Sequence, residues 1–248
     1  MWSLYDDLID SVPDGITVEE AFAGNRWTVL RTSDGRTGVA MTMTDAHFPS
    51  LLSAPLKGCS LRQAASLVKS WNFVDASFGT AALNACFNTE ENVSHLTRHI
   101  NPTAGAQQQE DAFVAYQPLV EGKKVAVIGH FPMLERCFAP ICQLSILERK
   151  PRPGDYPDSA SEFILPEQDY VFITGCTITN KTLPRLLQLS KNAHTVLVGP
   201  STPLSPVLFF YGVDDLSGFV VKDSAGCQDA VDHDANLFEY GKMVRILG

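Results

Sequence analysis

The clearest pattern in this chain is a continuous apolar run, Val125–Ile128, that follows two lysines and ends at Gly129. A run without polar alternation is typical of a strand buried on both faces, as in a parallel sheet covered by helices. The pattern therefore predicts that Lys123–Ile128 is the first strand of an open α/β sheet. Ligands of such sheets bind beyond the carboxyl ends of the strands, so Gly129, His130 and Phe131 are expected at a binding site.

Further short apolar runs follow along the chain, at Gln143–Leu147, Tyr170–Thr174, Thr195–Val198 and Gly218–Val221. A helical pattern, Lys181–Leu189, lies between the second and third of these runs, and Asn180 or Thr179 can cap its start. Strands that alternate with helices across short loops are typical of a Rossmann-like open, mostly parallel sheet. The C-terminal part of the chain is predicted to fold in this way.

The N-terminal part has a different order of elements. Apolar residues at helical spacing predict a helix within Met1–Val12. Strands are then expected at Ile16–Phe22, Trp27–Arg31 and Thr37–Thr42. The last two are joined through Asp34-Gly35, a strong hairpin signal. Helices are expected to begin after Ser60 and to span Phe73–Phe87, which is rich in small residues. A β-meander followed by helices makes an α+β module.

The composition changes between Asn88 and about Glu110, where Pro, Gly and polar residues occur without an apolar period. This composition is typical of a linker or an exposed connection, so the domain boundary is placed there. We expect an α+β domain over residues 1–104 and the Rossmann-like domain over residues 105–248. A short helix, Asp111–Leu119, would lead into the first strand of the second domain.

Composition and charge limit the partners and the compartment. The net charge of −9 and the pI near 5.1, with no Lys/Arg-rich run, argue against binding nucleic acid. The acidic N-terminus lacks the features of a secretory signal, and no apolar run reaches the ~20 residues of a spanning helix. We therefore expect a cytoplasmic protein without a membrane partner, whose six scattered cysteines are reduced thiols. The sequence leaves open whether the protein forms a homo-oligomer.

Loops that follow the strands of such a sheet converge at one edge, so their polar residues form one set. In this chain the set contains His130, Glu148 after the second strand, and Thr174 and Gly175 at the end of the third. Ser201 follows the fourth strand. This convergence predicts a site for a small-molecule ligand.

The known nucleotide-binding and hydrolytic motifs are absent. The dinucleotide fingerprint needs later glycines after the first one, whereas Gly129 is followed by His130 and then by Pro132, which has no N–H donor. No Walker lysine, Gly-x-Ser-x-Gly elbow, HExxH, EF-hand loop or Cys/His zinc pattern occurs. The sequence therefore identifies neither a cofactor nor a bound metal.

Two interpretations stay open for three of the candidate residues, His130, Glu148 and Asn180. His130 can transfer protons or ligate a metal, because imidazole changes charge near neutral pH, or it can simply hydrogen-bond its loop. Glu148 lies 19 residues beyond Gly129, at the place where Rossmann proteins commonly hold a ribose hydroxyl with a carboxylate. It can have that role, or it can be an ordinary solvated charge beside Arg149. Asn180 stands at a helix start, where free N–H groups favour anions, although capping alone would explain it.

Together these loops resemble the heavy-metal chelation family, a domain family of unknown function. The matching segments are Gly129–Pro132, Glu148–Pro151 with Pro153-Gly154-Asp155, Thr174-Gly175 with Asn180-Lys181-Thr182, Gly199-Pro200-Ser201 with Pro206, and Ser77–Asn84 followed by Asn88. The resemblance covers nearly the whole chain. It implies a domain similar to the enolase N-terminal fold, packed on a Rossmann-like domain partly similar to methyltransferases, with the site between them.

The resemblance also implies a function, the condensation or hydrolysis of a pterin-, flavin- or siderophore-like molecule that chelates metal. Asn84 would line the crevice, His130 would act as acid/base or ligand, and Glu148 would position a hydroxyl. The expected hydrogen-bond donors are Thr174, Asn180 and Ser201. The alternative is a non-catalytic binder of a heavy metal or of a metal–chelator complex. A methyltransferase using S-adenosylmethionine ranks below both, because the glycine-rich first loop is missing.

Overall fold

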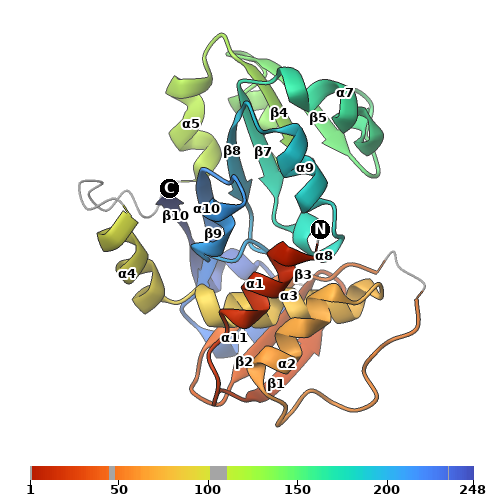
Figure 1. The fold of residues 1–248 in the computed structure, drawn as a ribbon, viewed down its shortest axis with the longest axis vertical. Coiled ribbons are helices and arrows are strands. Elements are labelled where there is room, and N and C mark those ends of the chain that lie inside the picture. Colours follow the sequence, from red (N-terminus) through yellow and green to blue (C-terminus); the bar gives the residue numbers. More distant parts are fainter. Residues whose placement is uncertain (1, 45–47, 101–110, 234) are drawn as a thin grey trace.

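Two β-sheets lie one above the other in the computed structural model, which describes residues 2–44, 48–100, 111–233 and 235–248 (Figure 1). The larger sheet has seven strands in the order β10-β9-β8-β7-β4-β5-β6. Neighbouring strands are parallel except β10, which is antiparallel to β9. The strands are β4 (Lys124–Ile128), β5 (Gln143–Glu148), β6 (Tyr156–Pro157), β7 (Tyr170–Thr174), β8 (His194–Val198), β9 (Asp215–Val221) and β10 (Gly241–Leu247). The expected mostly parallel sheet is confirmed.

Helices cover both faces of this sheet, as the continuous apolar run of β4 predicted. Val125 and Val127 belong to a buried cluster with α5, whereas Ala126 and Ile128 belong to a second cluster that includes residues of α9 and α10. Figure 1 shows α5 and α9 on opposite sides of the sheet. These helices are α5 (Ala112–Val120), α9 (Leu183–Leu189) and α10 (Val207–Phe210).

Strand β4 lies between β5 and β7, so the chain first adds strands on one side of β4 and afterwards on the other. At such a switch point the loops leave in opposite directions and open a crevice beyond the carboxyl ends of the strands. The loops that begin at Gly129 and Gly175 start at this point.

The smaller sheet is an antiparallel meander of β1 (Val18–Ala23), β2 (Trp27–Thr32) and β3 (Thr37–Met41), which confirms the expected order. The turn between β2 and β3 contains Asp34 and Gly35, and Gly35 has a φ of +85°. Residues with a side chain rarely adopt this conformation, so the Asp-Gly pair accounts for the hairpin.

The smaller sheet is covered by helices from both ends of the chain. Leu30 and Ala40 lie in one buried cluster with Ala81 of α3 (Phe73–Phe87). Val29 and Val39, on the other face, lie in a cluster with residues of α11 (Ser224–Asp232). The N-terminal sheet is therefore completed by a C-terminal helix.

The helices of the N-terminal part begin at residues suited to capping. Ser60 and Gln63 form a capping box before α2, with reciprocal hydrogen bonds of 3.1 Å. Asn72 caps α3 through its side-chain oxygen. The small residues of α3 allow close approach, since a Cβ on Gly79 would lie 2.0 Å from the backbone N of Val68. The first two helices are α1 (Ser3–Asp10) and α2 (Leu61–Ser66).

Helix α4 (Glu90–Ile100) and strand β10 differ most clearly from the expectation. Helix α4 occupies much of the segment expected to be a linker, so that interpretation was wrong there. The helix forms because Val93 and Leu96, one turn apart, are buried against the core. Strand β10 was not anticipated, because Lys242 and Arg245 interrupt its apolar pattern at the edge of the sheet. The boundary expected at residues 104 and 105 lies outside the described residues.

Short helical segments make up the remaining elements. They are the 3-10 helices η1 (Leu67–Lys69), η2 (Asp158–Ala160), η3 (Leu165–Glu167) and η4 (Leu237–Tyr240), with α6 (Leu134–Cys137), α7 (Ser161–Ile164) and α8 (Cys176–Thr179). Among the described residues, no helix has the length and apolarity required to cross a membrane.

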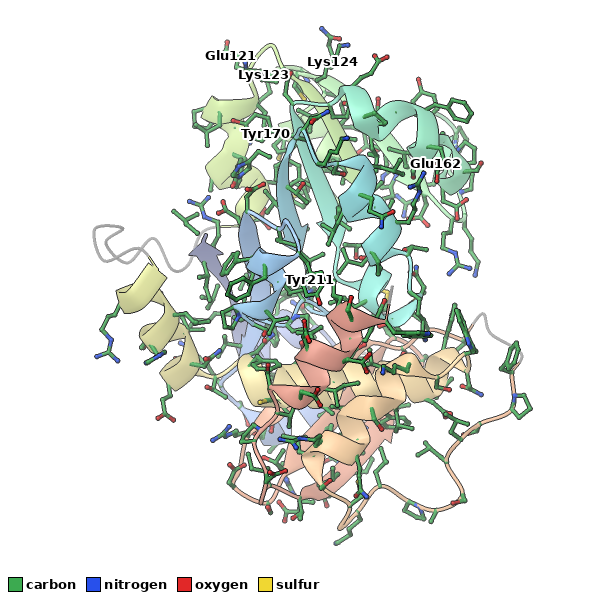
Figure 2. The ribbon with its side chains drawn as sticks, in the orientation of Figure 1. Glu121, Lys123, Lys124, Glu162, Tyr170 and Tyr211 are labelled. Carbon is green, nitrogen blue, oxygen red and sulfur yellow. The ribbon has the colours of Figure 1, made fainter. Side chains whose placement is uncertain are left out.

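The two parts of the chain share one hydrophobic core, which extends from α1, α2 and α3 to one face of the larger sheet. The Tyr5 hydroxyl donates to the carbonyl of Ile178 at 3.1 Å. The Tyr211 hydroxyl, which lies beside α1 in Figure 2, donates to Asp7 at 2.5 Å. By contrast, Lys124 marks the amino end of β4 at the far end of the molecule. The parts therefore meet at the carboxyl ends of the large sheet's strands.

Candidate functional site

The loop after β4 begins with a glycine that no other residue could replace without strain. Gly129 has a φ of +98°, and a Cβ there would lie 3.2 Å from Cγ2 of Thr174 at the end of β7. The ring of Phe131 packs over Gly129 and over Gly199 at the end of β8. Phe131 thus covers the carboxyl ends of two strands, with Phe113 of α5 behind it at a ring-centroid distance of 5.0 Å.

The imidazole of His130 lies between two carboxylates. Its Nδ1 is 2.9 Å from Oδ2 of Asp155, and its Nε2 is 3.0 Å from Oε1 of Glu135. The ring is 7% exposed and Asp155 is 3% exposed, whereas Glu135 is 62% exposed. One ring nitrogen therefore has a buried partner, and the other faces a carboxylate that is free to move into solvent.

Asp155 holds its place through the backbone as well as through His130. The N–H of Arg152 donates to Oδ2 of Asp155 at 3.0 Å. Burial opposes ionisation of this carboxyl, but its hydrogen bonds with Arg152 and His130 outweigh burial and lower the pKa of Asp155 below its usual value. An ionised Asp155 accepts from Nδ1 of His130, so a neutral ring would carry its proton there and present Nε2 as the base.

Glu148 lies against the same loop and connects it to the end of β5. Its Oε2 accepts from the backbone N–H of His130 at 3.0 Å, and its Oε1 accepts from the N–H of Lys150 at 3.2 Å. These bonds fix the position of the His130 loop. The hydroxyl-positioning role expected for Glu148 stays a prediction.

The loop after β7 packs against the loop after β8. A Cβ on Gly175 would lie 2.6 Å from backbone atoms of Ser201 and Thr202, so only glycine fits between the two loops. Thr174 accepts from the backbone N–H of Cys176 through Oγ1 at 3.3 Å. These contacts bring Thr174, Gly175 and Ser201 together, as the convergence of the loops predicted.

Ser201 links this edge of the large sheet to the smaller sheet. Its side chain is buried, and its Oγ accepts from the backbone N–H of Met41, the last residue of β3, at 2.8 Å. Cys176 lies beside both residues, with Sγ 3.7 Å from Sδ of Met41 and 3.8 Å from Oγ of Ser201. Burial raises the pKa of the Cys176 thiol, and the negative charge of Glu148 raises it further.

Asn84 lies fully buried where α3 meets the loop after β8. Its Nδ2 donates to the carbonyls of Val39 at 2.7 Å and Pro200 at 3.1 Å, while its Oδ1 has no hydrogen-bond partner among the described residues. Because both partners of Nδ2 are acceptors, they fix the orientation of the amide. Asn180 instead accepts from the N–H and hydroxyl of Thr182, at the start of α9.

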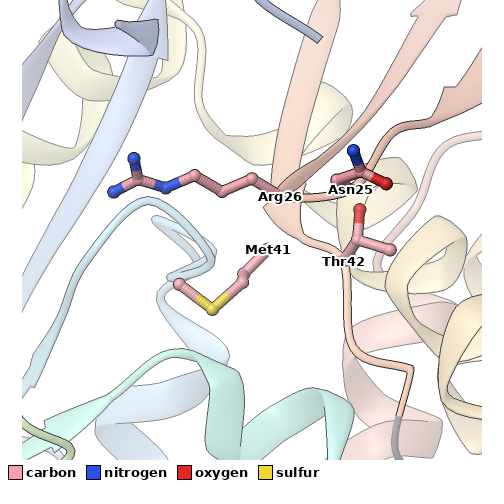
Figure 3. Close-up of a pocket in the computed structure, with 4 residues that line it drawn as sticks. All are labelled: Asn25, Arg26, Met41 and Thr42. Carbon is pink, nitrogen blue, oxygen red and sulfur yellow. The ribbon is translucent and has the colours of Figure 1, made fainter. Parts of the chain in front are cut away.

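An open pocket of about 360 Å³ lies beside Met41. Its lining includes Asn25 and Arg26 from the turn between β1 and β2, and Met41 and Thr42 from the end of β3. Figure 3 shows the side chains of Arg26 and Met41 extending into the same space, with Asn25 and Thr42 at its side. The pocket thus presents one positive charge and one thioether next to the Ser201 and Cys176 contact.

A second group of cations lies where the loops after β5 and β7 reach α3. The guanidinium of Arg149 is 5.8 Å, and the ammonium of Lys181 is 4.9 Å, from the ring centroid of Phe73. Burial lowers the pKa of Lys181 to about 8, although the negative charge of Asp75 opposes the shift. Lys181 also donates to the backbone carbonyls of Ser70 and Thr179, so it joins the two parts of the chain.

Several of these residues were missed by reasoning from sequence. Asp155 occurs in a segment of the family resemblance but was assigned no role, and Cys176 lies within a candidate loop but was grouped with the other cysteines as a reduced thiol. Glu135 and Met41 carry no local signal. Within the described parts of the chain, His, Cys, Asp and Glu side chains do not form a group of three or more that could hold a metal ion.

The sequence of this chain matches a known family of proteins. Residues 111–245 and residues 5–87 match two domains that share the description "Putative heavy-metal chelation". The first match covers more than half of the chain, so this protein belongs to that family. The resemblance expected from the sequence is confirmed.

Three similar proteins are described as uncharacterized or of unknown function. An uncharacterized protein of Methanocaldococcus jannaschii is 29% identical over 217 residues, which cover 82% of this chain and 77% of that protein. A crystal structure of a family member of unknown function from Desulfitobacterium hafniense is 43% identical, with a TM-score of 0.90 over 100% of this chain and 99% of that chain. One from Pyrococcus horikoshii, 20% identical, shares the fold with a TM-score of 0.80, over 99% of this chain and 98% of that one.

Proposed function

We propose that the crevice at the carboxyl ends of β4, β7 and β8 binds a small heterocyclic or anionic metabolite of the metal-chelating type. The proposal rests above all on the position of His130, held by a buried carboxylate at the switch point of the sheet. Crevices at switch points are the usual ligand sites of open α/β sheets. The family's description as heavy-metal chelation supports a ligand that carries or chelates a metal.

His130 is the acid/base of this proposal. Asp155 orients the ring through Nδ1, while the exposed Glu135 can withdraw and leave Nε2 facing a ligand. In a condensation or hydrolysis, Nε2 would accept a proton from an attacking hydroxyl or water and return it to the leaving group. Glu148 keeps the loop in place through the N–H of His130.

Arg26 gives the pocket a preference for anions. The chain carries a net charge of −9, so an anionic ligand needs a local positive charge to approach it. Arg26 lines the pocket with an exposed guanidinium, which can bind a carboxylate through two parallel hydrogen bonds. Thr42 and Asn25 supply further polar groups at the same place.

The test is a fluorescence titration of metal-free protein with pterin-6-carboxylate. We expect saturable binding that weakens roughly tenfold or more in Arg26→Gln, which removes a hydrogen-bonded charge worth about 1.5–3 kcal/mol. Arg98→Gln, an exposed arginine on α4, serves as the matched control and should bind like the unchanged protein. The proposal would be contradicted if neither pterin-6-carboxylate nor FMN bound. It would also be contradicted if Arg26→Gln and His130→Ala both bound pterin-6-carboxylate as tightly as the unchanged protein.

A second candidate is a non-catalytic binder of a heavy metal or of a metal–chelator complex. The observation in its favour is the pair of sulfur atoms of Met41 and Cys176 beside the pocket. Turnover would separate the two candidates, because a binder leaves its ligand chemically unchanged. A cytoplasmic location and the absence of a nucleic-acid partner stay predictions from charge and composition.

A further inference from the structure

Two sulfur atoms from opposite parts of the chain meet at the edge of the crevice. Met41 ends β3 of the smaller sheet, and Cys176 begins α8 after β7 of the larger one, yet Sδ and Sγ lie 3.7 Å apart. Met41 is 38% exposed and Cys176 is half-buried, so the pair is open to solvent. Met41 also lines the pocket with Arg26 (Figure 3).

The spacing of these atoms suits a shared metal ion. An ion about 2.3 Å from each sulfur, a typical metal–thiolate distance, would see them at an angle of roughly 107°. That angle is close to the tetrahedral value. Thiolate and thioether are soft ligands, which select ions such as Cu(I) over hard cations.

We propose that Cys176 and Met41 form a binding site for Cu(I) or a similar soft, closed-shell ion, with further coordination from a chelating ligand held near Arg26. Binding forms a bond between the metal and Sγ of Cys176 and releases the thiol proton to solvent, without any change of oxidation state. Sδ of Met41 donates a lone pair and releases nothing. The inference rests on the proposed function for the chelating ligand only, because the two sulfurs can bind the metal alone.

Other cysteines show what a packing thiol is like in this protein. The thiol of Cys142 is directed at the carbonyl of Phe138 at 3.2 Å, and the thiol of Cys227 at the carbonyl of Tyr240 at 4.0 Å. Cys227 is fully buried, as a small hydrophobe would be. Cys176 differs because its thiol contacts a second soft donor at an open pocket.

Competition between the protein and the chromophoric chelator bicinchoninate for Cu(I), under anaerobic conditions, tests this site. We expect the protein to withdraw one tightly bound Cu(I), and Cys176→Ser to abolish this binding. Met41→Leu, which conserves side-chain volume, should weaken the binding roughly tenfold or more, since even outer-shell partners of a metal contribute that much. Cys142→Ser is the matched thiol control and should bind like the unchanged protein.

Unchanged Cu(I) binding in Cys176→Ser, or equal affinity in Met41→Leu, would overturn the inference. X-ray absorption at the copper edge gives a second readout, with two sulfur ligands expected in the unchanged protein and one in Met41→Leu. If Cys176→Ser does not fold, the Cu(I) affinity and the number of sulfur ligands in Met41→Leu still test the inference. Failure here is distinguishable from failure of the proposed function, because the pterin titration uses metal-free protein and the copper competition uses the metal alone.

Discussion

Asn88 connects the two parts of the chain through three hydrogen bonds to backbone groups. Its Nδ2 donates to the carbonyls of Thr202 at 2.9 Å and Phe219 at 3.1 Å, and its Oδ1 accepts from the N–H of Leu204 at 2.7 Å. The side chain is 2% exposed. It therefore holds the loop after β8, which carries Ser201, against the end of α3.

Replacing Asn88 by Ala should destabilise the protein by about 3–4 kcal/mol. Each hydrogen bond contributes about 1 kcal/mol net, and the backbone groups left unpaired in a buried place add to the loss. Asn88→Asp conserves the shape but puts a carboxylate oxygen against two carbonyl oxygens, so it should cost at least as much. The geometry thus predicts that the conservative substitution does not rescue stability.

The assay is urea unfolding followed by circular dichroism, with the m-value compared among variants to exclude a change in the denatured state. Asn192→Ala, in the exposed turn before β8, is the matched control and should change stability by no more than about 0.5 kcal/mol. A cost below about 1 kcal/mol for Asn88→Ala would refute the reasoning, because it would mean that water replaces these bonds at little cost.

Three other predictions concern single residues. Gly175→Ala should destabilise by about 1–3 kcal/mol and weaken pterin-6-carboxylate binding, because its Cβ would displace the backbone at Ser201; unchanged unfolding and titration curves would contradict this. The hydrogen bond with Asp215 raises the pKa of His194, so the stability that His194 contributes is present below its unfolded pKa of about 6.5 and lost as pH rises through the folded pKa. The unfolding free energy of the unchanged protein relative to His194→Gln should therefore fall with rising pH, and a flat difference would argue against the bond. Burial lowers the pKa of Lys181 to about 8, so the unchanged protein should gain stability relative to Lys181→Met as pH rises from 8 towards the ordinary lysine value of 10.5; pH-independent urea midpoints would show that the ammonium is solvated.

Much of the fold could be predicted because its signals are local. The apolar run of β4 and the runs that became β5, β7, β8 and β9 occur at nearly the expected residues, as do the hairpin at Asp34-Gly35 and the cap at Ser60. A strand buried on both faces must be apolar throughout, and a tight hairpin needs residues that tolerate positive φ. Such requirements fall on neighbouring residues, so they can be seen in the sequence itself.

The elements that were missed depend on distant partners. Helix α4 has a polar composition, and among its described side chains Val93 and Leu96 are buried in a core formed by distant segments. Strand β10 carries Lys242 and Arg245 among its apolar residues and is a strand because β9 offers it an antiparallel edge. The pattern of β10 is not strong enough alone to predict a strand, whereas Val93 and Leu96 of α4 do have helical spacing.

The residues of the candidate site likewise fall into those that the sequence predicts and those that only the tertiary structure brings together. Sequence by itself determined that Gly129, His130, Glu148, Thr174, Gly175 and Ser201 follow strands of one sheet, because the carboxyl ends of parallel strands meet at one edge. Only the tertiary structure decided that Asp155 and Glu135 bracket the ring of His130, and that Met41 meets Cys176 across the two sheets. Strand order and the packing of distant segments set these contacts, and both arise from the fit of whole surfaces rather than from the preference of any short stretch of chain.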